Sequence, residues 1–140
     1  MNPIVNRKAK FDYVFLETYT SGICLLGSEV KSIKEGKVNI IDSYCILDVS
    51  GMILKNMDIP TRSGSFQHEP KRDRRLLLRK KELKKIDSSL DRGLTIIPIK
   101  IFTNPKGKIK MEIAICRGKK NYDKREDIKR REAEREIKSS

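Results

Sequence analysis

The side chains best suited to chemistry in this chain gather near its C-terminus, where lysines and arginines adjoin one aromatic ring. The run begins at Gly118-Lys119-Lys120, includes Tyr122 and continues as a charged segment to Ser140. Lysine and arginine neutralise phosphates, and an aromatic ring can stack on a base. With ten Lys/Arg and only three aliphatic side chains from Arg117 to Ser140, the segment cannot build a core. It indicates either an RNA contact or a tail that only improves solubility.

Cysteine and histidine are too few and too dispersed to predict a metal or catalytic site. Cys24, Cys45 and Cys116 are widely separated, and each lies beside aliphatic residues, so we predict three buried, reduced thiols. A Cys-x-x-Cys pair, which metal binding favours, is missing from the sequence. His68 is the only histidine, and in a polar loop we expect it to face solvent. We therefore predict no metal, no cofactor and no Cys–His or Ser–His–Asp catalysis.

The carboxylates do not point to an enzyme either. Asp42, Asp58, Asp73 and Asp87 are scattered among predicted turns and a helix, where capping and solubility explain them. A nuclease would need clustered carboxylates or a histidine base. We therefore predict that the chain is not an enzyme.

Composition points to a polyanionic partner. The 140 residues carry a formal net charge of +13, and their 37% hydrophobic content suffices for one core if the tail is left out of it. RNA is the first candidate and an anionic membrane surface the second. No run reaches the ~18 apolar residues of a membrane span, and the N-terminus lacks the apolar core of a signal peptide. We expect a cytoplasmic protein with one domain over residues 6–117 and a tail over 118–140.

The first half of the body predicts two β-hairpins. Residues 11–20 are rich in β-formers, Thr20-Ser21-Gly22 is expected to turn, and residues 23–26 to return. Residues 43–49 and 52–57 form a second predicted hairpin about Ser50-Gly51.

A short helix is predicted between these hairpins. Ser28 is expected to cap it at residues 29–35, with Gly36 just past its end. Lys31 and Lys34 point outward from this helix, and either a solvated face or an RNA contact fits them.

The second half predicts a basic helix and a third hairpin. Leu76, Leu83, Ile86 and Leu90 recur at helical spacing, so we expect a helix from the leucine triplet 76–78 to Gly93 with lysines on its outer face. Strands are predicted on both sides of the turn 104–107, and Ile109, Met111, Ile113 and Ile115 alternate with Lys108, Lys110 and Glu112. The segment from Pro60 to Pro70, with Phe66 as its one apolar residue, is expected to be an exposed loop, and its role is open.

These elements predict a mainly β fold. Six strands in three hairpins, with two to three helices, favour an antiparallel barrel resembling an oligonucleotide-binding fold, because closure removes exposed edges. A sandwich or an open α+β sheet would fit the same pattern.

The tail is predicted to be a conditional helix. Glu126 and Arg130, like Asp127 and Arg131, are acid-first pairs at four-residue spacing, worth ~0.2–0.5 kcal/mol each on a helix. Because the tail has no apolar face to dock, we expect it to be disordered when free and ordered by a partner.

Several motifs, in order from Asn6 to Glu136, are those of one known family. They are Asn6-Arg7-Lys8-Ala9-Lys10, Gly27-Ser28-Glu29-Val30-Lys31-Ser32, Asn39, Asp42-Ser43-Tyr44, Arg75-Leu76-Leu77-Leu78, Gly118-Lys119-Lys120 and the run from Tyr122 to Lys129. The chain resembles the bacterial SsrA-binding protein (SmpB) family.

The resemblance implies a function in trans-translation. Members bind the tRNA-like domain of transfer-messenger RNA (tmRNA, or SsrA RNA) and, with elongation factor Tu and alanyl-tmRNA, help to deliver it to stalled ribosomes. There the tail becomes helical in the empty mRNA channel, near the decoding centre of the 16S rRNA. The resemblance implies a monomer. A structural ribosomal protein and a general RNA-binding module are the alternatives.

The resemblance also implies two sets of site residues. The RNA-binding set is Asn6, Arg7, Lys8, Lys31, Lys34, Leu77, Lys108 and Lys110. The ribosome-contacting tail set is Gly118, Lys119, Lys120, Tyr122, Asp123, Lys124 and Arg125.

This sequence departs from the family pattern at two places. Thr20 stands where relatives can carry an acidic residue implicated in RNA binding, so that contribution is not carried over. Some relatives extend beyond the position of Ser140 with an apolar pair, for which only Ile137 could substitute here.

Overall fold

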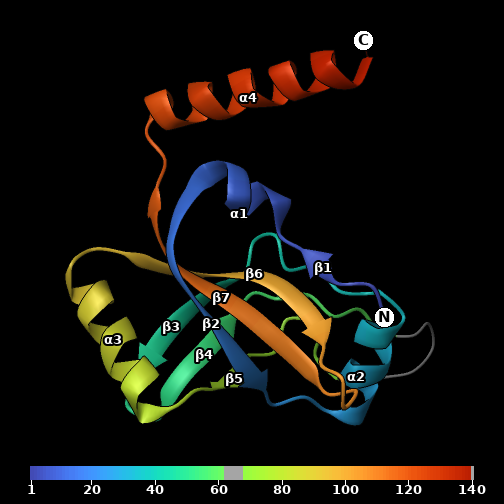
Figure 1. Cartoon of the computed structure of the whole chain (residues 1–140). Helices are drawn as coiled ribbons and strands as arrows, with labels where there is room; N and C mark the ends of the chain where they lie inside the picture. Colours follow the sequence, from blue (N-terminus) through green and yellow to red (C-terminus); the bar gives the residue numbers. More distant parts are fainter. Residues whose placement is uncertain (62–67, 140) are drawn as a thin grey trace.

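One antiparallel β-sheet organises the computed structural model, which describes residues 1–61 and 68–139 (Figure 1). Its seven strands follow the order β1-β6-β7-β2-β5-β4-β3. The elements in chain order are β1 (Ile4–Val5), α1 (Arg7–Asp12), β2 (Tyr13–Ile23), α2 (Gly27–Lys34), β3 (Tyr44–Asp48), β4 (Gly51–Lys55), β5 (Arg74–Leu77), α3 (Lys80–Asp91), β6 (Thr95–Thr103), β7 (Ile109–Gly118) and α4 (Asn121–Ser139). Most of the predicted 60–70 loop, including Phe66, lies outside the described residues.

The predicted hairpin of β6 and β7 forms and lies inside the sheet, between β1 and the central strand β2. Ile109, Met111, Ile113 and Ile115 of β7 are buried in the main core, which confirms their predicted alternation. Gly107 closes the turn with φ 79°, a backbone conformation that glycine adopts without steric cost. A second, smaller cluster forms where α1 packs on the sheet and brings Ala9 against Cys116. The sheet therefore has apolar contacts on both faces near α1.

The sheet curls so that β3, its last strand, lies against β6. In the described part of the chain no hydrogen-bonded ladder joins β3 to β6, so the mainly β fold is confirmed but closure of a barrel is not. The predicted strand number is too low. The sequence interpretation missed the two-residue β1 and the short β5.

The predicted turn at Thr20-Ser21-Gly22 is wrong, because β2 runs through it to Ile23. Ser21 donates a hydrogen bond from Oγ to the carbonyl of Met111 at 3.1 Å, and Gly22 pairs with Lys110 on one side and with Leu77 on the other. The predicted hairpin through Leu26 is therefore absent. Glycine here serves a close approach between strands instead of a turn.

The leucine triplet 76–78 is not helical, contrary to the prediction. Leu76 and Leu77 end β5, where Leu76 is buried and pairs with Ile23 and Met52. The helix α3 begins only at Lys80. Leu83, Ile86 and Leu90 pack on the main core as the spacing predicted. The helical spacing placed Leu76 correctly in the core but in the wrong element, because an apolar residue is buried in a strand such as β5 as well as in a helix.

The helix α2 forms as predicted, but its N-terminus is held differently. The carboxylate of Glu29 accepts a hydrogen bond from Leu26 N at 2.8 Å, whereas Ser28 Oγ lies 2.8 Å from His68 Nδ1. His68 is buried, with Nε2 2.8 Å from the carbonyl oxygen of Ile59, so its predicted exposure is wrong. The two ring nitrogens of His68 lie beside Ser28 and Ile59 instead of facing solvent.

The burial of the cysteines was predicted correctly for Cys45 and Cys116 and wrongly for Cys24, which is exposed just past the end of β2. Burial raises the pKa of the Cys116 thiol, which suits an inert structural residue.

Candidate nucleic-acid interface

A row of residues across three strands brings Leu77 and Lys110 together. In the pairing of β5, β2 and β7, Gly22 lies directly between Leu77 and Lys110. The side chain of Leu77 is 55% exposed, although it ends a strand whose other residues are more buried. Lys108, also exposed, precedes β7, and its backbone N donates to Asn104 Oδ1 at 2.9 Å. Three residues of the predicted RNA-binding set thus share one end of the sheet.

A buried ionic cluster fixes α2 beside this end of the sheet. Arg74 is fully buried and donates from Nε to Glu29 Oε2 at 2.7 Å and from Nη1 to the carbonyl of Met57 at 2.6 Å. Arg72 Nη2 donates to the other oxygen of Glu29 at 2.6 Å. Burial alone would raise the pKa of Glu29, but the hydrogen bonds from Arg72, Leu26 N and Arg74 lower it. The cluster holds a charged carboxylate inside the fold.

The lysines of α2 point away from the core and toward solvent. Ser32 and Ile33 are buried, while Lys31 and Lys34 are exposed. Figure 1 places α2 next to the turn between β6 and β7, at the end of the molecule away from α4. Lys31, Lys34 and Lys108 therefore line one end of the body.

Arg7 and Lys8 belong to a different surface. They lie on α1 and are exposed, and α1 lies beside α4 at the opposite end of the body (Figure 1). Asn6 is 1% exposed, donates to the carbonyl of Pro98 at 3.1 Å and caps α1 by accepting from Ala9 N at 3.0 Å. The predicted direct RNA contact by Asn6 is corrected, since its amide is used inside the fold to position α1.

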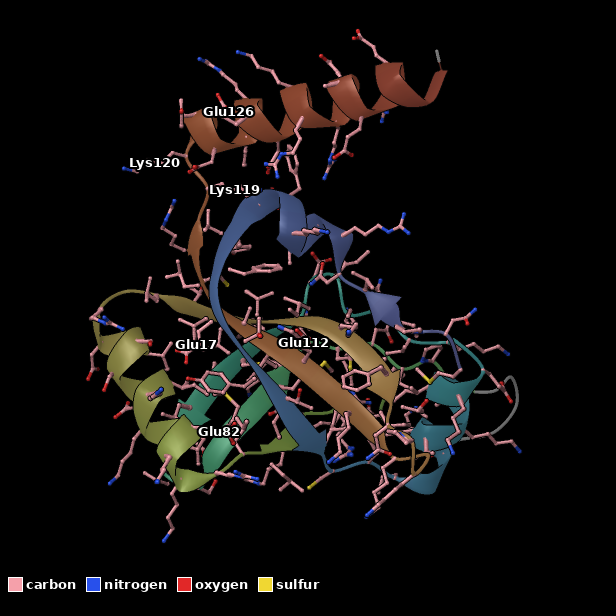
Figure 2. The ribbon with its side chains drawn as sticks, viewed as in Figure 1. Glu17, Glu82, Glu112, Lys119, Lys120 and Glu126 are labelled. Atoms are coloured by element: carbon pink, nitrogen blue, oxygen red, sulfur yellow. The ribbon has the colours of Figure 1, made fainter. Side chains whose placement is uncertain are left out.

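The joint between β7 and α4 is built around Lys119, which Figure 2 labels together with Lys120 and Glu126. The side chain of Lys119 is only 10% exposed and pairs with Asp127. Its backbone N donates to the carbonyl of Asp12 at 2.8 Å, and its Nζ donates to the carbonyl of Lys10 at 3.1 Å. Burial, together with the nearby Arg130, lowers the pKa of Lys119. Lys119 is a structural cation at this joint, whereas the exposed Lys120 is available to a partner.

The first turn of α4 presents its side chains in different directions. Asp123 accepts from Lys120 N and from Arg117 Nη1, both at 3.1 Å, and these hydrogen bonds lower its pKa. Tyr122 is 70% exposed, and Arg125 is exposed as well. Lys124 turns toward α1 and lies 3.6 Å from Asp12 Oδ1.

An open groove of about 1120 Å³ separates α1 from α4. Arg7 and Lys10 line one wall, and Arg130 and Arg135 line the other. The side chain of Phe11 also contributes to the lining.

Two further classes of site are absent from the described residues. Across 1–61 and 68–139, none of the helices has both the length and the apolar character needed to cross a membrane. The same residues bring together no group of three or more His, Cys, Asp and Glu side chains that could hold a metal ion.

The comparison with known families covers both the body and the tail. The family model described as SmpB protein matches residues 3–140. This chain belongs to the SmpB family. The match includes both ends of the body, the joint at Lys119 and the whole of α4.

Individual SmpB relatives match almost the whole chain. The SsrA-binding protein of Thermosipho melanesiensis is 51% identical over 135 residues, which cover 94% of this chain and 92% of that protein. The SsrA-binding protein of Flavobacterium johnsoniae is 46% identical over 137 residues, covering 96% and 91%. A chain of the solved structure "tmRNA-SmpB: a journey to the center of the bacterial ribosome" is 36% identical with a TM-score of 0.71, covering 90% of this chain and 94% of that one.

Sequence interpretation missed α1 and its partners at the joint. Asn6 followed by Arg7-Lys8-Ala9 is a possible helix start, because asparagine is a preferred N-cap, and this signal was available in the SmpB motif itself. Phe11 and Asp12 were assigned instead to the first strand. Nothing in the local pattern shows that they face a helix more than 100 residues later in the sequence.

Proposed function

We propose that this chain is an SsrA-binding protein that binds the tRNA-like domain of tmRNA and helps to bring it to stalled ribosomes. In this proposal the RNA reaches the ribosome as alanyl-tmRNA with elongation factor Tu. The protein acts as a monomer in the cytoplasm and does no covalent chemistry. The observation that carries the proposal is the family match over residues 3–140, which includes the body and the tail.

The body would bind the RNA through the end that carries Leu77, Lys108 and Lys110. The lysines supply phosphate contacts, and the exposed Leu77 offers an apolar surface beside them. Structured RNA is recognised mainly by its shape, its phosphates and its 2′-hydroxyls, so a rigid row across three strands suits it. Lys31 and Lys34 on α2 would extend the same surface.

The tail would contact the ribosome through α4. Tyr122 and Arg125 are exposed, and a ring next to a guanidinium group can stack on an unpaired base of 16S rRNA. Gly118, Lys120, Asp123 and Lys124 complete the proposed tail contacts, with Lys119 fixing the joint. We further propose that α4 exchanges between a docked and a disordered state in the free protein, and that the empty mRNA channel stabilises the helix.

Arg7 and Lys8 would serve the ribosomal end, because α1 lies beside α4. This assignment separates two groups of cations that the sequence interpretation had placed in one RNA-binding set. The body would hold the tmRNA at one end while the other end and the tail meet the ribosome.

The RNA that co-purifies with the tagged, full-length protein tests this proposal. We expect tmRNA to be the main enriched RNA, and the protein to be substoichiometric on ribosomes in a sucrose gradient. Stoichiometric presence on all ribosomes without enrichment of tmRNA would mean a structural ribosomal protein instead.

A further inference from the structure

The helix α4 meets the body at one small and chemically distinct place. Lys124 Nζ lies 5.7 Å from the centre of the Phe11 ring, and the guanidinium carbon of Arg131 lies 5.4 Å from the same centre. Lys124 also lies 3.6 Å from Asp12 Oδ1. Two cations of α4 thus converge on two neighbouring residues of α1.

This pairing is selective, because α1 is otherwise basic. Its six residues are Arg7, Lys8, Ala9, Lys10, Phe11 and Asp12, so Asp12 is its one acid and Phe11 its one aromatic residue. Cations of α4 placed against the rest of α1 would meet like charges. A cation gains from an aromatic face and from a carboxylate, and α4 places Lys124 and Arg131 against those two groups.

The contact does not depend on apolar packing by α4. Ile128, the aliphatic side chain in the middle of the helix, is 45% exposed, and Tyr122 is 70% exposed. The remaining link is the joint, where Lys119 bonds to the carbonyls of Lys10 and Asp12 and pairs with Asp127. Phe11 and Asp12 therefore act together with the Lys119–Asp127 pair to set how α4 is rotated about its own axis.

The rotation of α4 determines which of its side chains remain exposed to the ribosome. With Lys124 and Arg131 turned to α1, Tyr122 and Arg125 are left on exposed parts of the helix. We infer that α1 is a docking platform for α4, with Phe11 and Asp12 as positioning residues that orient Tyr122 and Arg125 toward the ribosome. The role of this orientation rests on the proposed function, whereas the docking itself does not.

The test compares substitutions of Phe11 that separate its size from its π face. Phe11→Leu keeps an apolar side chain but removes the π face, while Phe11→Tyr and Phe11→Trp retain one. Phe15→Leu is the matched control, because Phe15 is a half-buried aromatic residue of β2 that packs beside Ala9 of α1 and, among the described residues, no cation of α4 lies over its ring. Asp12→Asn is a second variant that leaves the apolar cluster intact.

Docking is measured on the full-length protein by the distance between spin labels. Ser88→Cys on α3 and Glu132→Cys on α4 provide two exposed attachment sites in a Cys24→Ser background, since Cys45 and Cys116 are buried. We expect a distinct docked distance, beside the broad distribution of the undocked tail, in the parent protein, the Phe15→Leu control and the Phe11→Tyr and Phe11→Trp variants. Phe11→Leu and Asp12→Asn should reduce the fraction of molecules at the docked distance. Absence of any docked distance in the parent protein would overturn the docking platform.

Function is measured separately on the unlabelled proteins. Phe11→Leu should lower peptide tagging on stalled ribosomes by about fivefold, the effect of losing two weak cation–π contacts at an exposed site, while affinity for the tRNA-like RNA stays unchanged. Phe11→Tyr should tag peptides at the level of the parent protein. A fraction at the docked distance in both Phe11→Leu and Asp12→Asn as large as in the parent protein would also overturn the docking platform. Failure of the parent protein to bind the tRNA-like RNA would instead overturn the proposed function and leave the docking result standing.

Discussion

Leu77 packs directly over Gly22, with its Cβ 3.3 Å from the position that a Cβ on Gly22 would occupy. Lys110 pairs with Gly22 from the opposite strand. The missing side chain of Gly22 therefore allows Leu77 to lie close to the sheet, beside a lysine of the proposed RNA surface. The shape of the proposed RNA surface at Leu77 therefore depends on the absence of a side chain at Gly22.

Gly22→Ala should displace Leu77 and weaken RNA binding more than it weakens the fold. The new methyl group would lie 3.3 Å from Leu77 Cβ, so the end of β5 must shift by a few tenths of an ångström, which is possible because Leu77 is half exposed. We expect a several-fold loss of affinity for the tRNA-like RNA and a change in the free energy of unfolding below ~1 kcal/mol. Gly27→Ala is the control, because no atom lies within 4 Å of the position that a Cβ on Gly27 would take. A Gly22→Ala protein with parental affinity would refute the shape argument.

Glu29→Gln should destabilise the protein strongly, because it removes the charge that compensates the buried Arg74. Breaking a buried ion pair by removing one partner costs ~3–5 kcal/mol. Urea denaturation at neutral pH measures this loss. Lys8→Gln is the control, since its pairing with Asp42 at 3.5 Å is on the surface and should contribute little.

The same carboxylate predicts how stability depends on pH. The pKa of Glu29 in the folded protein is lowered from its ordinary value of 4.5. Its contribution to stability is therefore fully present above pH 4.5 and is lost as the pH falls through the lower folded value. Urea denaturation between neutral and acidic pH should show this loss in the parent protein and a weaker dependence in Glu29→Gln. Identical pH profiles would mean that Glu29 is not charged in the folded state.

Lys108→Glu should weaken RNA binding without unfolding the protein. Lys108 is exposed, and its backbone N is used in the turn, by donating to Asn104 Oδ1. Loss of one phosphate contact should lower affinity about tenfold and reduce the slope of affinity against salt by about one. Lys129→Glu is the control, because it changes the net charge equally but lies on α4. Equal losses in both variants would show a net-charge effect instead of a contact at Lys108.

Residues whose environment is local were predicted well from the sequence. The turn at residues 104–107 and the alternation of β7 follow from neighbouring residues, and the structure confirms them. Gly22 was misread because glycine suits both a turn and a close approach, and only the strand β5 decides between them. Leu76 was placed in a helix because spacing alone does not separate two buried environments.

The site was predicted in its composition but not in its arrangement. Lys31, Lys34, Lys108 and Lys110 are exposed or partly exposed at one end of the body. Asn6 and Lys119 were assigned to contacts with RNA or the ribosome, but both use their polar atoms inside the protein. One partner of each, the carbonyl of Pro98 for Asn6 and the carbonyl of Lys10 for Lys119, is 92 and 109 residues away in the sequence, which no local pattern reveals.

The proposed function divides the labour between a body that binds tmRNA and a tail that engages the ribosome. Among the contacts between elements, α4 is joined mainly to α1, so removing it leaves the sheet intact. Deletion of residues 123–140 is the most direct measurement. It should leave affinity for the tRNA-like RNA within about twofold of the full-length protein, because phosphate contacts by the body are retained, and should abolish peptide tagging on stalled ribosomes. Loss of RNA binding in the truncated protein would contradict this division.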